Sequence, residues 1–357
     1  MTDLLAKLAY QTVQYTKSSF ALTHKTLSSR LLNLFYDVPG KDQLKPLSPE
    51  LLETLQTSLA RLLETEWKDA ERGIYPVELL FDNPWEDFLS YYPALLLDLP
   101  RLRERSLQQN YRDFAEDLDT NNYPNYYRRN FHFQTDGYFS DLSANLYDLQ
   151  VEILFNGCAD AMRRRVLAPL KQGLEAGFPS VPSRDLRILD IACGTGRTLK
   201  FLRAMLPQAN LFGVDLSTAY LRKAARWLGQ LPGELPQLVG GKVEELPYRG
   251  GYFHAATSVF LFHELPGTVR QRAIEECFRV IKPGGWFVIC DSIQLGDVPD
   301  WDPLLHNFPI SFHEPYYNDY IRDDLERRLH RAGFGEVYTQ MHHASKYWVA
   351  RKPQIEP

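Results

Sequence analysis

The sequence predicts an α/β protein whose first half is helical and whose second half folds around a mostly parallel β-sheet. Before Arg187, apolar residues recur at helical spacing and no convincing alternating strand pattern occurs. From Arg187 onward, short apolar runs alternate with amphipathic stretches, which is typical of βαβ units. A chain of 357 residues is long enough for two domains, or for one domain with a large cap.

In the first half, helical patterning marks three segments: Ser48–Gly73, Pro93–Leu118 and Ser140–Leu174. The Asn-, Pro- and Tyr-rich stretch Thr120–Tyr127 separates the second from the third. Residues 1–130 contain no motif that we recognise. We therefore predict a helical N-terminal domain or cap over residues 1–178, with a lid segment near residues 125–150, followed by a linker at Pro179–Asp185.

In the second half, four apolar runs are predicted as strands, in this order: RILDIA, LFGVD, AATSVFLF and WFVICD. Each is followed by a stretch of helical spacing: Thr198–Leu206, Ala219–Leu228, Thr268–Ile281 and Asn318–Ala332. The tail differs, because EVYTQMHHA and KYWVARK are separated by only a short turn. We expect these two runs to form an antiparallel pair at the edge of the sheet.

Composition excludes several classes of function. The formal net charge of -5 offers no basic footprint, so a nucleic-acid partner is not expected. The four cysteines are scattered without a C-x-x-C pair, which favours buried free thiols over disulfides or a zinc site, and no metal site is predicted. We find neither a signal pattern nor a run near the ~18 apolar residues of a transmembrane segment, so a cytoplasmic enzyme is expected.

The sharpest motif is DIACGTG at residues 190–196, where the first predicted strand meets the first helix. Gly194 and Gly196 allow the backbone to approach a ligand, and the helix behind them offers free N–H groups to an anion. About 20 residues later, Asp215 ends the second strand, where a carboxylate can accept hydrogen bonds from both ribose hydroxyls. The spacing predicts a nucleoside site at the carboxyl ends of parallel strands.

The same motif narrows the choice of nucleoside. A dinucleotide fingerprint needs a third glycine, and Leu199 stands at that position, which disfavours an NAD-dependent oxidoreductase. A phosphate-binding loop ending in Gly-Lys-Ser/Thr is also missing from the sequence. A ribose with an amino-acid carboxylate suits the site, and S-adenosylmethionine has both groups.

Five segments in order, DIACGTGRTLKFL, LFGVDLS, VEELPY, LFHELP and ECFRVIKPGGWFVICDS, resemble the class I, seven-strand, Rossmann-like S-adenosylmethionine-dependent methyltransferases. They are most similar to the small-molecule branch with the ubiquinone and menaquinone C-methyltransferases. The resemblance covers roughly residues 187–350. It implies a mostly parallel seven-stranded sheet with an antiparallel C-terminal hairpin, in a methyltransferase domain over residues 184–352.

The resemblance also implies a set of cofactor-binding residues: Asp190, Ala192, Cys193, Gly194, Gly196, Asp215, Leu216, Lys242, Val243, Glu244, Ser258, Val259 and Phe260. In this set the two glycines approach the methionyl part and Asp215 takes the ribose. The segment 242–244 flanks the adenine, and the segment 258–260 closes the site. Two residues depart from the family pattern, since Lys242 and His254 stand where relatives usually have Asp.

The catalytic candidates are His263 and His132. His263 follows the fourth strand and could act as a general base toward the acceptor, or it could instead cap the following helix. His132 lies in a polar and aromatic run, residues 130–138, that could fold over the cofactor or simply seal an interface. Acceptor-binding candidates come from this run and from a second one, residues 308–320, which could equally be core: Gln134, Tyr138, His313, Tyr316 and Tyr317.

The sequence therefore predicts methyl transfer from S-adenosylmethionine to an oxygen or carbon of a small, aromatic or apolar acceptor. The enzyme would align acceptor and methyl and exclude water, with the helical first half acting as a cap. Two alternatives remain open at this point: methylation of a protein or RNA, and binding of the cofactor without catalysis. The acceptor and the oligomeric state are not predicted.

Overall fold

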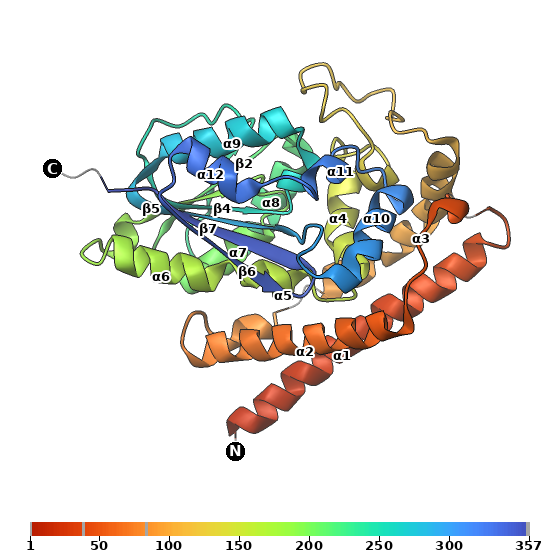
Figure 1. The fold of residues 1–357 in the computed structure, drawn as a ribbon, viewed down its shortest axis with the longest axis horizontal. Helices are drawn as coiled ribbons and strands as arrows, with labels where there is room; N and C mark the ends of the chain where they lie inside the picture. The colour runs from red at the N-terminus through yellow and green to blue at the C-terminus, as the bar shows by residue number, and fades with distance from the viewer. Residues whose placement is uncertain (1, 38–39, 83–84, 355–357) are drawn as a thin grey trace.

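The computed structural model describes residues 2–37, 40–82 and 85–354, and its centre is a seven-stranded sheet with the order β3-β2-β1-β4-β5-β7-β6 (Figure 1). The strands are β1 (Arg187–Ile191), β2 (Asn210–Asp215), β3 (Gln237–Gly240), β4 (Phe253–Val259), β5 (Ile281–Ser292), β6 (Glu336–His342) and β7 (Ser345–Arg351). Strands β1 to β5 pair in parallel, whereas β7 runs antiparallel to both β5 and β6. The predicted α/β sheet with an antiparallel C-terminal pair is confirmed.

Alternation along the strands gives the sheet two apolar faces. Ile188 of β1 belongs to one buried cluster and its neighbour Leu189 to the other. The first face is covered by α5 (Ala159–Arg164), α6 (Leu167–Gly177), α7 (Arg197–Met205) and α8 (Thr218–Leu228). The second face is covered by α9 (Gly267–Val280) and α12 (Leu325–Ala332), which lie above the sheet in Figure 1 while α6 lies below it.

The first half adds four longer helices: α1 (Thr2–Leu32), α2 (Pro49–Glu71), α3 (Trp85–Gln108) and α4 (Asp141–Leu154). Side chains of α1 and α2, among them Tyr10, Leu62 and Trp67, join the cluster on the first face of the sheet. The N-terminal helices therefore share a core with the sheet. None of the helices in the described residues is both long enough and apolar enough to cross a membrane.

Several predicted boundaries in the first half were wrong. Helix α1 was not predicted, and the segment predicted at 93–118 is a helix that begins at Trp85 and ends at Gln108, where Gln109 takes a positive φ. The segment predicted at 140–174 is divided into α4, α5 and α6. The break between α4 and α5 contains Gly157. A Cβ at this position would stand 2.7 Å from Lys17 Cβ, so the glycine allows α1 to cross closely.

The second half also differs in detail. Strand β3 was not identified by its residues, because it is a four-residue edge strand with no fully buried position. Strand β5 starts at Ile281, well before the run WFVICD that predicted it, and contains a bulge where its pairing on β4 shifts from Phe253 to Ala255. The predicted helix 318–332 is split into α11 (Tyr317–Tyr320) and α12, and α10 (Asp302–Ser311) precedes them. All four cysteines are buried and unpaired, as predicted.

Candidate active site

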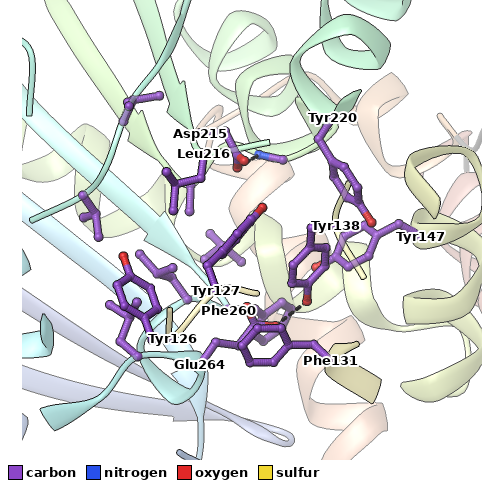
Figure 2. Close-up of a pocket in the computed structure, with 18 residues that line it drawn as sticks. Tyr126, Tyr127, Phe131, Tyr138, Tyr147, Asp215, Leu216, Tyr220, Phe260 and Glu264 are labelled. Atoms are coloured by element: carbon purple, nitrogen blue, oxygen red, sulfur yellow. Dashed lines mark hydrogen bonds between the residues drawn. The ribbon is translucent and has the colours of Figure 1, made fainter. Parts of the chain in front are cut away.

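A pocket lies at the carboxyl ends of β1, β2 and β4, where the strand order reverses, which is where ligands bind in open α/β sheets. Residues of the sheet side of its wall are Ala192, Gly194, Val214, Asp215, Leu216, Gly241, Val243, Val259, Phe260, Leu261, Glu264 and Leu265. Aromatic residues complete the wall: Tyr126, Tyr127, Phe131, Tyr138, Tyr147 and Tyr220. We call this cavity the first pocket (Figure 2).

The carboxylate of Asp215 accepts hydrogen bonds from two backbone N–H groups. Its Oδ2 accepts a hydrogen bond from the Gly194 N–H and its Oδ1 accepts one from the Ser217 N–H, both at 2.8 Å. Burial raises the pKa of Asp215 to about 6, although the hydrogen bonds from Ser217 and Gly194 oppose this rise. The side chain remains able to accept further hydrogen bonds from a ligand, because a carboxylate offers about four acceptor positions.

The two glycines of the motif have different surroundings. A Cβ on Gly194 would meet nothing nearer than Tyr220 Cδ1 at 4.0 Å, so this glycine is open to the pocket. A Cβ on Gly196 would stand 2.8 Å from Leu228 Cδ1, so this glycine allows α7 and α8 to pack closely. Gly196 and the buried Cys193 lie behind the pocket wall rather than in it.

The aromatic side of the first pocket comes from the segment predicted as a lid, residues 125–150, and from α8. Figure 2 shows the rings of Tyr127 and Tyr138 between Asp215 and Glu264. Tyr138 stacks on Phe131 at 5.6 Å between ring centroids and packs edge-on against Tyr220 at 5.4 Å. Among these rings, Tyr138 is the one predicted from the sequence as an acceptor-binding candidate, since the Tyr-rich stretch 120–127 has the composition of a helix break.

The remaining predicted cofactor residues fall into two groups. Leu216, Val243, Val259 and Phe260 line the first pocket. The others lie beside or beneath it: Asp190, Lys242, Glu244 and Ser258.

Three of this second group have their side chains engaged elsewhere. Asp190 accepts a hydrogen bond from the Thr257 hydroxyl at 2.9 Å, and burial raises its pKa to about 7. Glu244 accepts one from the Tyr126 hydroxyl at 2.9 Å, and Lys242 lies 3.9 Å from Glu245.

The histidine that departs from the family pattern lies away from the pocket. His254 stands near the start of β4, at the end opposite the pocket, where its Nδ1 accepts a hydrogen bond from the Arg187 N–H at 2.9 Å. Burial lowers the pKa of His254 to about 4. This substitution therefore leaves the site geometry untouched.

A second, mostly apolar pocket adjoins the first one. Its wall residues outside the first pocket are Leu55, His132, Val151, Leu154, Phe155, His263, Ser292, Ile293, Trp301, Leu304, Leu305, Phe308, Tyr317 and Ala344. The two pockets have Tyr147, Phe260 and Glu264 in common. These three residues therefore form a wall common to both pockets.

His263 and Asp291 form a buried pair at the wall of the second pocket. His263 Nδ1 donates to Asp291 Oδ1 at 2.6 Å, while Asp291 Oδ2 accepts the Phe262 N–H at 2.7 Å. Burial lowers the pKa of His263, but the charge and hydrogen bond of Asp291, together with the charges of Glu314 and Glu264, outweigh it and raise this pKa to about 10. Because Nδ1 is engaged, Nε2 is the ring nitrogen left for a molecule in the pocket.

A second polar cluster contains His132, Glu264 and Glu314, of which Glu314 is buried and the other two are partly exposed. His132 Nε2 lies 3.2 Å from Glu314 Oε1 and 3.9 Å from Glu264 Oε1, and Glu264 also accepts a hydrogen bond from the Tyr138 hydroxyl. Burial lowers the pKa of His132 to about 3, and it raises the pKa of Glu264 to about 7 and that of Glu314 well above its usual range. No sequence motif connects His132, Glu264 and Glu314, or predicts the pairing of His263 with Asp291.

The other predicted acceptor residues are dispersed. Tyr317 lines the second pocket and its hydroxyl lies 2.8 Å from Ser292 Oγ. Gln134 is buried and lines a further cavity between α1, α3 and α4, which His132 also borders. His313 stacks on Tyr111 at 4.4 Å, and Tyr316 packs against Arg129, so neither lines the first or the second pocket.

The sequence of this chain is similar to those of known methyltransferases. A family model described as a methyltransferase domain matches residues 188–285. An uncharacterized methyltransferase of Synechocystis sp. is 30% identical over 179 residues, which cover 48% of this chain and 80% of that protein. Two proteins named ubiquinone/menaquinone biosynthesis C-methyltransferase UbiE also match.

The first of these two, from Methylobacterium nodulans, is 30% identical over 45% of this chain. The second, from Syntrophotalea carbinolica, is 36% identical over 43% of this chain. In each case the matched region spans 60% of the relative's own length. The residues matched by the family model contain the glycine turn and strands β2, β3 and β4.

Proposed function

This chain belongs to the class I S-adenosylmethionine-dependent methyltransferases, and we propose that it methylates an oxygen or carbon atom of a small, largely apolar acceptor. The observation that carries this proposal is the common wall of the two pockets, which consists of Tyr147, Phe260 and Glu264. A cofactor in the first pocket and an acceptor in the second would meet across this wall.

The first pocket suits the cofactor, S-adenosylmethionine, which when bound supplies a methyl group activated on a sulfonium. Asp215 has a buried carboxylate that can accept hydrogen bonds from the ribose hydroxyls. The open face of Gly194 leaves room for the methionyl part, and Val243 offers an apolar wall for the adenine. The rings of Tyr127 and Tyr138 would exclude water from the reacting centre.

The second pocket favours an apolar acceptor with at least one polar reacting group. Trp301, Leu305 and Phe308 supply apolar walls, and aromatic walls suit flat molecules. His263 Nε2 would hydrogen-bond the reacting oxygen, since Asp291 fixes the orientation of the ring through Nδ1. Residues 1–178 would act as the cap, because α2 and α4 supply part of this wall through Leu55 and Val151.

The chemistry asked of the protein is modest. The acceptor's electron pair forms the bond to the methyl carbon, the electron pair of the broken C–S bond stays on sulfur, and the acceptor's proton leaves to solvent. The side chains contribute alignment and water exclusion, which together supply much of the rate in transfers of this kind. Two relatives are named as C-methyltransferases of ubiquinone and menaquinone biosynthesis, which supports methylation of a carbon atom in a small molecule. The matched region spans 60% of each of those proteins.

A direct test is to incubate the purified chain with methyl-labelled S-adenosylmethionine and separate acceptor pools. One pool holds phenols, quinols and 1,3-dicarbonyl compounds, and the others hold unfolded protein and total RNA. Label transfer to the small-molecule pool, with stoichiometric S-adenosylhomocysteine, is the expected result. Transfer only to protein or RNA would replace this proposal with a macromolecular acceptor. Cofactor binding with no transfer to any pool would favour a binding protein.

A further inference from the structure

We propose that His132, Glu264 and Glu314 bind a divalent cation of the first transition row at the junction of the two pockets. The site shares Glu264 with the wall of the first pocket and was not predicted from the sequence, since its residues lie far apart in the chain. They come from the segment between α3 and α4, from the turn after β4, and from the turn after α10. The fold brings them together at one point.

The distances between the candidate ligand atoms are close to those found around one bound metal ion. One ligand atom from each residue lies within 4.8 Å of the others, with His132 Nε2 at 3.2 Å from Glu314 Oε1 and 3.9 Å from Glu264 Oε1. Nitrogen and carboxylate ligands bind Zn²⁺ at about 2.0–2.2 Å, so two ligands of one ion lie up to ~4 Å apart. Side-chain movements below ~1 Å would therefore complete the coordination.

Glu314 provides an independent reason to expect a cation. Its side chain is 0% exposed, and within the described part of the chain neither of its carboxylate oxygens accepts a hydrogen bond. A buried carboxylate without donors is costly unless it is neutralised or coordinated. Asp291 adds a further buried carboxylate to this region, and His263 alone among these groups provides a balancing positive charge.

The donor set points to the class of ion. One imidazole with two carboxylates suits Mn²⁺, Fe²⁺ or Zn²⁺, whereas a site without nitrogen would favour Mg²⁺ or Ca²⁺. The Tyr138 hydroxyl donates to Glu264, and such outer partners are typical of metal ligands because they fix the carboxylate orientation. The cluster therefore has both a ligand set and a supporting hydrogen bond.

The position of the ion gives it a role in the proposed reaction, and this part rests on the proposed function. His132 and Glu264 both line the second pocket, so an ion bound to them would face the acceptor. An acceptor hydroxyl could then be a further ligand, which would lower its pKa and fix its oxygen beside the first pocket. Phenols, enols and vicinal diols are acceptors of this class.

The test uses the full chain after treatment with EDTA and desalting. Mn²⁺ is titrated in while the electron paramagnetic resonance signal of the free ion is followed, and Zn²⁺ is then added as a competitor. We expect one Mn²⁺ per chain. Loss of a residue that only hydrogen-bonds a metal ligand typically weakens metal binding 10–100-fold. Glu314 and His132 are proposed as direct ligands, so we expect Glu314→Gln and His132→Asn to weaken binding at least ~10-fold. The matched control is Glu276→Gln, which removes a carboxylate outside both pockets.

Wild-type protein also gives a readout that does not depend on the folding of variants. Nitrogen hyperfine coupling to the bound Mn²⁺ is expected from His132. Failure of both ions to bind stoichiometrically would overturn the inference, as would binding that the two variants leave unchanged. S-adenosylhomocysteine is titrated in parallel. If it binds to a chain that takes up no metal, the metal site is excluded while the proposed function stands.

Discussion

Asp215 and Gly194 are joined by a hydrogen bond of 2.8 Å from the Gly194 N–H to Asp215 Oδ2, which fastens the end of β2 to the glycine turn after β1. The carboxylate thus fixes the glycine turn and also lines the first pocket. We expect Asp215→Ala to weaken binding of S-adenosylhomocysteine at least ~10-fold, because hydrogen bonds to charged groups contribute about 1.5–3 kcal/mol. Isothermal titration measures this. Asp141→Ala, which removes an exposed partner of Arg222, should leave binding unchanged.

The same carboxyl predicts a pH dependence of cofactor binding. Burial raises the pKa of Asp215 to about 6, and the ionised form accepts hydrogen bonds from both ribose hydroxyls more strongly than the neutral acid does. Affinity for S-adenosylhomocysteine should therefore be constant above this pH and fall by up to about tenfold per pH unit below it. A titration series from pH 5 to pH 8 checks this, and an affinity that does not change across pH 6 would contradict it.

The Asp215 carboxyl affects folding stability with the opposite pH dependence. Its pKa is higher in the folded chain than the ordinary value of 3.8, so the folded state binds the proton more tightly. The stability that this proton contributes is complete below about pH 4 and is lost as the pH rises through about 6. Cofactor affinity and this contribution to stability should therefore change in opposite directions over the same interval.

The sequence predicted the features of this enzyme that depend on local backbone requirements. Gly194 and Asp215 are recognisable because a turn between strand and helix needs glycine and a strand end presents its side chain to the site. Spacing could not distinguish Gly194 from Gly196, since the neighbour that makes Gly196 necessary is Leu228 on another helix. Helix α1 was missed because its apolar side chains are divided between the core and solvent.

The cluster of His132, Glu264 and Glu314 could not be predicted from the sequence for a different reason. Glu314 lies 182 positions after His132, and their 3.2 Å contact arises only when two irregular segments fold over the end of β4. Irregular segments carry no periodic signal, so their side-chain directions cannot be deduced from pattern. The pairing of His263 with Asp291 is similar, because adjacent parallel strands place their ends together without any mark in the local sequence.

Substituting each glycine of the motif should separate stability from binding. Gly196→Ala places a Cβ 2.8 Å from Leu228 at a residue with φ of 87°, so we expect a loss of about 1–3 kcal/mol in the free energy of unfolding. Gly194 also has a positive φ, 53°, so Gly194→Ala should cost about 1 kcal/mol of backbone strain. Its Cβ meets no atom nearer than 4.0 Å but projects into the pocket, so this variant should impair S-adenosylhomocysteine binding more than stability. Urea denaturation and calorimetric titration measure the two effects, and equal effects of both variants on binding would contradict the assignment.

The second pocket can be tested through Phe308, which packs on Tyr317 at 4.8 Å between ring centroids and does not line the first pocket. Phe308→Ala removes an apolar wall worth ~1–3 kcal/mol of contact with an acceptor. We expect the KM for the acceptor to rise ~5-fold or more while the affinity for S-adenosylhomocysteine stays the same. A parallel loss of cofactor affinity would show that the two pockets are not separate sites.

The joining of the N-terminal helices to the sheet depends on a buried ion pair between Glu66 of α2 and Arg164 of α5. Arg164 Nε donates to Glu66 Oε1 at 2.5 Å, the Tyr10 hydroxyl of α1 also donates to Glu66, and neither charged side chain is more than 1% exposed. Glu66→Gln leaves the guanidinium buried without its counter-charge, which typically costs about 3–5 kcal/mol. We therefore expect a marked fall in the midpoint of urea unfolding.

Glu64→Gln is the matched control, because Glu64 lies one half-turn away on the same helix and pairs with Lys7 at the surface. An exposed pair of this kind contributes about 0–1 kcal/mol, so the control should unfold almost as the wild type does. If Glu66→Gln produced a separate, earlier transition for the first half, the helical cap and the sheet would be independent folding units. A single shifted transition would instead mean that α1 and α2 fold cooperatively with the sheet, as their common apolar cluster indicates.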